Sequence, residues 1–347
     1  MKKLLILGLS VLLTLGMAAL TLAIDIETTG ELDFNYHGHH WTGEDSRYTQ
    51  FEAGLYNHLD INDLVSGDLN FWLDTNGTEH NFQIDAGYVT FNFGGKTLKV
   101  GYDDYPLDAS LNVMGDFVKK GLFSGGLKPA AVQLLGTVPL GDSFKLQGGY
   151  FHNTGGNFYK SNNDDPQSSK YKGVMGDDGR DNFLLRGSYA AGKFDTNLTY
   201  LHVGECVWDK VKPAAEYMID AGYKINDKFR VYAAYIGVNQ VMDGNKDWDP
   251  EAFEDQTDNF GIVGFSASLG RWWFSAEYTV LTPDKDKNYE YVDYTDTTGK
   301  EHNWADNPPY GFSISYYFGY NTTLQYTRVA NTGNYNDRDR LRLQVKF

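Results

Sequence analysis

Oxygen-bearing side chains recur at regular intervals in one acidic stretch of the chain, residues 239–258. The candidate ligands take positions 1, 3, 5, 7 and 12 of an EF-hand-like calcium loop, with Glu251 at position 9: Asp243, Asn245, Asp247, Asp249 and Glu254. Position 6 is Trp248, where that loop needs Gly for its sharp turn, and no helix is predicted on either side. The spacing indicates a Ca²⁺ site or, as the simpler alternative, an acidic loop exposed to solvent.

Histidines form a second candidate cluster. His37, His39 and His40 provide three imidazoles within four residues, enough to bind a transition metal. Successive strand residues point to opposite faces, so His40 would lie on the other side from His37 and His39, and a solvated loop is favoured. Among the eight His residues, no nucleophile, base and orienting group stand out together, and there is no Gly-rich phosphate loop. An enzyme is therefore not expected.

Charges follow a pattern in two further segments. The connection 103–128 carries apolar residues between its charged ones, which are Asp103, Asp104, Asp108, Asp116, Lys119 and Lys120. A loop exposed only to water does not need these apolar residues, so it is expected to pack against a wall of the protein. The last ten residues alternate, with cations on the polar side at Arg338, Arg340, Arg342 and Lys346. These cations would face the acidic connection, pair with Glu31 and Asp33 near the N-terminus, or do both.

Composition excludes several classes of protein. The chain has 46 acidic residues against 30 basic ones, a formal charge of −16, which argues against a nucleic-acid partner. The single Cys206 excludes an internal disulfide framework and a cysteine-based zinc site. A mean hydropathy of −0.47 leaves no room for a bundle of transmembrane helices. The aromatic share of 15% is unusual in a chain this polar.

Residues 1–23 are predicted to be an export signal. Lys2 and Lys3 form a basic start, residues 4–22 carry no charge, and small residues occupy the positions that a signal peptidase reads before its cut after Ala23. The alternative is an uncleaved anchor helix, but the basic cluster that would follow such a helix is missing. Residues 24–347 are predicted to form a single domain.

This domain shows the two-residue alternation of β-strands and no convincing 3.6-residue period. Sixteen strands are expected, with fourteen or eighteen as alternatives, near residues 30–38, 48–59, 65–75, 82–93, 97–102, 129–139, 143–153, 182–191, 194–203, 214–225, 229–238, 259–269, 272–281, 309–318, 321–329 and 338–347. Short turns alternate with long polar connections at 103–128, 154–181, 239–258 and 282–308. The pattern predicts an all-β fold, a transmembrane antiparallel β-barrel with long extracellular loops and short periplasmic turns.

Aromatic residues support the same interpretation. Each of four short turns is followed by an aromatic residue and, six residues later on the same face, by a tyrosine; the pairs are Phe144 and Tyr150, Phe194 and Tyr200, Phe229 and Tyr235, and Trp272 and Tyr278. Six residues rise about 20 Å along a strand, and the apolar band of a membrane barrel between its aromatic girdles is about 25 Å tall. A lipid-facing surface would therefore account for the high aromatic content.

The chain resembles the general diffusion porins of bacterial outer membranes. The resemblance rests on the signal peptide, the sixteen-strand pattern, the sequence DAGYVTF at 85–91 running through a Gly-rich turn into LKVGY at 98–102, and the terminal Phe347. It implies that the barrel-assembly machinery reads Phe347. It also implies that 103–128 folds into the channel as a constriction loop facing the basic row, with a transverse field between them, and that the chain forms a homotrimer. The acidic-aromatic motif at the tip of the family's loop has no clear match.

A barrel of sixteen strands is too wide for its inward side chains to fill. The predicted function is an outer-membrane channel for passive diffusion of ions and small hydrophilic solutes. Acidic loops favour a weak cation preference, which the arginine row would oppose. Outer-membrane lipid and lipopolysaccharide are expected partners, and no cofactor other than Ca²⁺ is expected. The alternatives are a substrate-specific channel for sugars or anions and a barrel with a structural or adhesive role.

Overall fold

The computed structural model of the chain describes residues 25–41, 44–76, 79–104, 106, 111–114, 130–152, 181–203, 214–240, 256–281, 293–295, 301–303, 308–330 and 338–347. Sixteen strands form one closed barrel: β1 (Asp25–Trp41), β2 (Glu44–Asn62), β3 (Val65–Asn76), β4 (Glu79–Phe93), β5 (Lys96–Asp104), β6 (Ala130–Leu140), β7 (Phe144–His152), β8 (Asp181–Ala191), β9 (Phe194–Val203), β10 (Ala214–Lys224), β11 (Phe229–Gln240), β12 (Gln256–Leu269), β13 (Trp272–Leu281), β16 (Tyr310–Gly319), β17 (Thr322–Ala330) and β18 (Arg338–Lys346). Each predicted strand corresponds to one of these, so the predicted fold class is confirmed.

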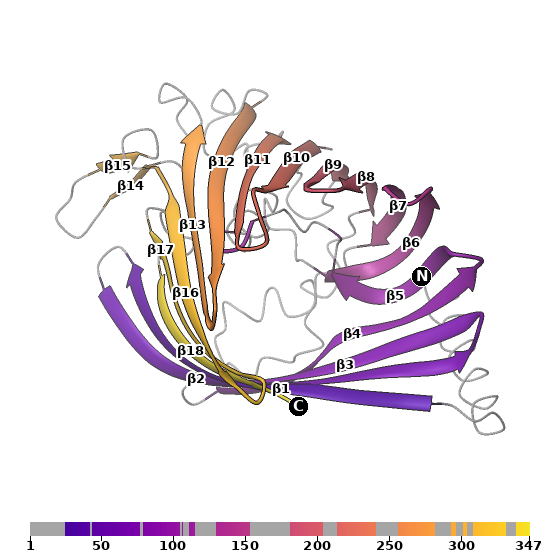
Figure 1. Ribbon diagram of the computed structural model, residues 1–347, viewed down its shortest axis with the longest axis horizontal. Coiled ribbons are helices and arrows are strands. Elements are labelled where there is room, and N and C mark those ends of the chain that lie inside the picture. Colours follow the sequence, from indigo (N-terminus) through magenta and orange to yellow (C-terminus); the bar gives the residue numbers. More distant parts are fainter. Residues whose placement is uncertain are drawn as a thin grey trace, which may run out of the picture.

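Every barrel strand pairs antiparallel with its neighbours in the chain, and β1 pairs with β18 to close the ring (Figure 1). Two further strands, β14 (Asp293–Thr295) and β15 (Glu301–Asn303), form a separate hairpin between β13 and β16. The sequence does not predict this hairpin, because strands of three residues are too short to show alternation. The described residues contain no helix that is long and apolar enough to cross a membrane.

Alternation along the strands separates an outward apolar face from an inward face. In β8, Phe183 and Leu185 are exposed by 52% and 53%, whereas the residue after each of them, Leu184 and Arg186, is buried. The eight aromatic residues predicted as two rows, from Phe144 to Tyr278, are all exposed on the outward face. At the end of the barrel opposite the short turns, the Tyr150 hydroxyl donates to Asp181 at 2.5 Å. In an aromatic girdle, the rings lie in lipid and the hydroxyl groups lie at the polar boundary of the membrane, as they do here.

The seam between β1 and β18 depends on a glycine. Gly30 and Phe347 exchange both backbone hydrogen bonds, at 2.8 and 2.9 Å. A Cβ atom on Gly30 would lie 2.6 Å from Cζ of Phe347, so only glycine leaves room for the ring to lie over the strand. The C-terminal residue thus takes part in closing the barrel.

Candidate functional site

The segment after β5 is attached to the opposite inner wall of the barrel. Both carboxylate oxygens of Glu277 accept backbone N–H groups from this segment, from Asn112 at 2.5 Å, Val113 at 2.9 Å and Met114 at 2.5 Å. Glu277 is 3% exposed and points inward, since the next residue, Tyr278, is 49% exposed on the outer face. β13 lies halfway around the ring of sixteen strands from β5, so residues 112–114 lie inside the barrel, on its far side.

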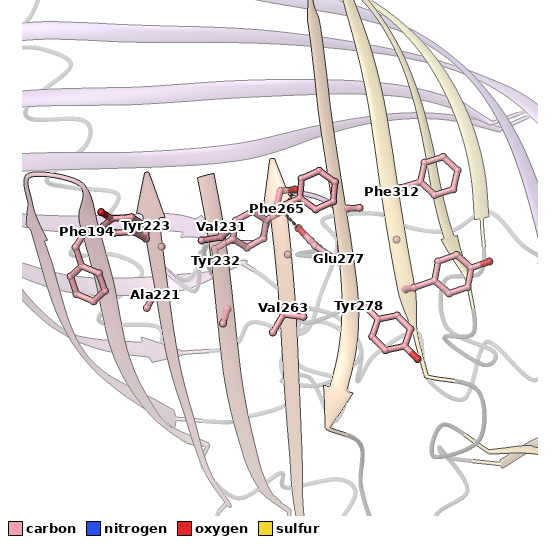
Figure 2. Close-up of a pocket in the computed structure, with 16 residues that line it drawn as sticks. Phe194, Ala221, Tyr223, Val231, Tyr232, Val263, Phe265, Glu277, Tyr278 and Phe312 are labelled. Carbon is pink, nitrogen blue, oxygen red and sulfur yellow. Dashed lines mark hydrogen bonds between the residues drawn. The ribbon is translucent and has the colours of Figure 1, made fainter. Parts of the chain in front are cut away.

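Residues of three other strands, β8, β11 and β16, support this attachment. The Tyr232 hydroxyl of β11 donates to Glu277 at 2.8 Å, as Figure 2 shows. Val113 and Met114 are buried, and a Cβ on Gly311 of β16 would lie 2.7 Å from Cγ1 of Val113. On β8, Arg186 donates to the carbonyl oxygen of Pro106 at 2.5 Å. Packing and charge-assisted hydrogen bonds therefore hold the described part of the loop inside the barrel.

Glu277 was missed by the sequence analysis, although a signal was present. It is the one acidic residue of the strand Trp272–Leu281, and it occupies an inward position of the alternation. A carboxylate in an apolar strand needs hydrogen-bond donors when it is buried. The loop provides them, but the sequence does not show which segment does.

The basic residues of β18 lie beside acidic residues of β1. Arg342 forms an ion pair with Asp33, and its guanidinium lies 3.9 Å from Glu31. The Lys346 ammonium also lies 3.9 Å from Glu31. Pairing between the first and last strands, one of the two arrangements expected from the sequence, is therefore present for Arg342. Arg340 lies opposite His37 in the strand register, and the Arg338 side chain lies outside the described residues.

Of the acidic connection, the structure describes only the beginning and a short inner segment. The Asp103 carboxylate pairs with the Lys99 ammonium at 2.5 Å. The backbone carbonyl of Asp104 accepts a hydrogen bond from Gln133 at 3.3 Å. Several predicted site residues lie outside the described residues: Asp108, Asp116, Lys119, Lys120, Asp243, Asn245, Asp247, Asp249 and Glu254. Whether they narrow a channel or bind calcium stays a prediction.

Three carboxylates lie side by side on the inner wall of β1 to β3. Asp33 is the register partner of Glu52, and Glu52 is the partner of Asp74. The Asn35 amide donates to Glu52 at 2.7 Å, and the Gln50 amide donates to Asp74 at 2.8 Å. Neutral amides thus provide hydrogen bonds to two of the three carboxylates, and Arg340 and Arg342 of β18 lie close enough to interact electrostatically with Glu52.

The inner wall of β6 to β12 has a different character. Its half away from the short turns carries large apolar side chains that are each at most 4% exposed: Leu135, Phe151, Leu184, Leu201, Met218, Ile236 and Ile262. Towards the short turns the same wall becomes polar, with an ion pair between Arg230 and Asp195 at 2.6 Å. The acidic wall of β1 to β3 and the apolar wall of β6 to β12 therefore enclose an asymmetric interior.

Within the described ranges, neither a metal-binding cluster nor a polar groove on the outer face of β10 to β16 forms a second site. No group of three or more His, Cys, Asp or Glu side chains is placed there to hold a metal ion. His37 instead stacks on Tyr48, with ring centres 4.7 Å apart. A groove of about 750 Å³ lies on the outer face of β10 to β16 (Figure 2). Its floor of Ala221, Ala233 and Val263 is apolar, which suits lipid chains and not a hydrophilic solute.

Comparisons with known proteins identify the fold. No family model matches the sequence, and no curated protein matches it closely. OmpF of Salmonella typhi, solved in complex with daunomycin, shares 11% identity over 93% of this chain and 97% of its own, with a TM-score of 0.62. OprB of Pseudomonas putida shares 12% identity over 95% and 96%, with a TM-score of 0.61. OmpT of Vibrio cholerae, lacking loop L8, shares 11% over 94% and 99%, with a TM-score of 0.55. The chain therefore has the fold of bacterial porins.

Proposed function

We propose that the chain forms a water-filled channel in the bacterial outer membrane for passive diffusion of ions and small hydrophilic solutes. The attachment of residues 112–114 to Glu277 carries this proposal, because a chain segment crossing the interior narrows the barrel without adding a strand. Selectivity in such a channel depends on the size and charge of the narrowed passage. The porin fold of OmpF and OprB agrees with the proposal.

A weak preference for cations is part of the proposal. On the inner wall of β1 to β3, Glu52 and Asp74 accept hydrogen bonds from amides. Arg342 and Lys346 lie beside Asp33 and Glu31, and Arg342 also interacts electrostatically with Glu52. A wall with this excess of carboxylates raises the local concentration of cations. The reversal potential across a KCl gradient tests this part, and a clear preference for chloride would contradict it.

Single-channel recording in planar bilayers tests the channel itself. The full mature protein should give large, ohmic currents that rise with salt and do not saturate with any one solute. A small conductance that one sugar or anion saturates would indicate the substrate-specific alternative. A folded, inserted barrel without conductance would indicate a structural or adhesive role. Folding is checked separately by the resistance of the barrel to unfolding in cold dodecyl sulfate.

Partners follow from the same proposal. The outward apolar face fits membrane lipid, and the acidic loops fit divalent bridging to lipopolysaccharide. Phe347 is proposed as the assembly signal, and a homotrimer is proposed from the resemblance. Calcium binding by the segment containing Asp243 and Glu254 is tested by titration calorimetry with the purified barrel, in which Asp243→Asn should remove the heat of binding.

A further inference from the structure

Two aromatic rings meet over one glycine on the inner wall of β2 and β3. A Cβ atom on Gly54 would lie 2.6 Å from Oη of Tyr56 and 2.8 Å from Cζ3 of Trp72. Both side chains are half-buried, and they share the inward parity because Leu55 and Leu69 are exposed on the outer face. Without a side chain at position 54, the rings can lie against the strand. Tyr56 and Trp72 therefore form an aromatic platform that faces the interior.

Carboxylates surround the aromatic platform. Glu31 accepts the Tyr56 hydroxyl at 2.8 Å. Glu52 and Asp74 lie two residues along their strands from Gly54 and Trp72, on the same inward face and opposite one another in register. Both are half-buried and therefore reachable from the interior. Proteins bind organic cations at aromatic surfaces of this kind, with carboxylates beside the rings.

Two buried acceptor oxygens lie on the same wall as the platform, where Nε of Arg342 is also buried without a hydrogen-bond partner among the described residues. Oδ1 of Asp33 and Oδ1 of Asn35 are buried and have no hydrogen-bond donor within the described part of the chain. Asp33 is 0% exposed and Asn35 is 3% exposed. An ammonium ion brings N–H donors together with positive charge, whereas a sugar hydroxyl brings no charge and an anion only adds acceptors.

We propose that the platform of Tyr56 and Trp72, together with Glu52 and Asp74, binds organic ammonium ions that carry an apolar body; Glu31, which already lies beside Arg342 and Lys346, holds the Tyr56 hydroxyl. The ammonium group would lie towards Glu52 and Asp74, and the apolar body would lie on the two rings. Such solutes would be held briefly on this wall as they pass. The inference rests on the proposed channel function and names a class of solute that the channel favours.

Block of single-channel current by benzylammonium at neutral pH tests the site. Benzyl alcohol, which has nearly the same shape without the charge, and maltose are the comparison solutes. Benzylammonium should reduce the current saturably, and the other two should not at equal concentration. Trp72→Ala should raise the half-blocking concentration by about fivefold through the lost contact between the indole and the benzyl ring. The double substitution Glu52→Gln with Asp74→Asn should raise the half-blocking concentration at least as much. Because it preserves side-chain shape, this variant tests the site even if the Trp72→Ala protein does not insert into the bilayer.

Glu27→Gln is the matched control. Glu27 lies on the inward face of β1, is exposed, and is the register partner of His58 near the short-turn end. The substitution Glu27→Gln removes one charge from the same wall at a distance from the platform. It should leave the half-blocking concentration unchanged. Equal block by benzyl alcohol, an equal shift in Glu27→Gln, or a block by maltose that Trp72→Ala abolishes would each overturn the inference. A conducting channel that benzylammonium does not block refutes the site alone, whereas a folded barrel without conductance refutes the channel function.

Discussion

Met114 and Glu277 are 163 residues apart in the sequence, yet the Met114 backbone N–H donates to the Glu277 carboxylate at 2.5 Å. The bond joins a segment that follows β5 to the wall halfway around the barrel. Because Met114 is 0% exposed, the contact is part of a packed interior. One inward carboxylate of β13 therefore holds residues 112–114 against the inner wall.

Replacing this carboxylate should loosen the loop. Three backbone N–H groups and one hydroxyl now donate to the two carboxylate oxygens of Glu277. Glu277→Gln leaves only one acceptor oxygen for these four donors. Hydrogen bonds to charged groups contribute about 1.5–3 kcal/mol each. We expect noisier single-channel currents and a changed mean conductance, measured in planar bilayers. Glu27→Gln is the control at an exposed position, and currents identical to wild type in Glu277→Gln would refute the anchoring role.

The Gly30 seam should not tolerate a methyl group. In Gly30→Ala, the new Cβ would lie 2.6 Å from the Phe347 ring, and overpacking of this kind costs about 1–3 kcal/mol. We expect the variant to unfold in detergent at a lower urea concentration. Tryptophan fluorescence measures the midpoint of this unfolding. Gly38→Ala on the same strand is the matched control, since its Cβ would make only an ordinary contact at 3.7 Å. Equal midpoints for the two variants would contradict the role of the ring at the seam.

Arg342 should matter more for stability than the other cation beside Glu31. Asp33 is 0% exposed, so Arg342→Met leaves a buried carboxylate without its ion pair, a loss of about 3–5 kcal/mol. Lys346 is 60% exposed and 3.9 Å from Glu31, so Lys346→Met should cost under about 1 kcal/mol. Urea unfolding of both variants measures the difference.

A double substitution checks the cause of that loss. Asp33→Asn added to Arg342→Met removes the buried charge and should recover part of the stability. If Arg342→Met alone is as stable as Lys346→Met, the pair with Asp33 is not a structural one.

Selectivity should follow the carboxylates that accept hydrogen bonds from amides. Glu52→Gln combined with Asp74→Asn removes two negative charges from the inner wall of β2 and β3 while preserving side-chain shape. The reversal potential across a KCl gradient should move towards zero or towards anion preference. The shift should shrink at 1 M salt, where the Debye length is about 3 Å. No shift at low salt would place the selectivity elsewhere in the channel.

Much of the fold is encoded locally. Side chains alternate with a period of two along a strand, so a run such as Arg338 to Phe347 shows its two faces without knowledge of its neighbours. The same rule located the outward rows that begin at Phe144 and Tyr150, and their exposure confirms it. The hairpin β14–β15 was not predicted, because three residues are too few for a two-residue period to appear.

Contacts across the barrel were decided by the tertiary structure. Arg342 meets Asp33 because closure of the ring brings together residues 309 positions apart, and the sequence left open whether the cations would face the loop or the first strand. Glu277 meets residues 112–114 because the segment after β5 crosses the interior. Alternation fixes which way a side chain points, since it depends on neighbours in the chain. Which partner a side chain meets depends on strand register and loop path, and these are set only when the whole barrel closes.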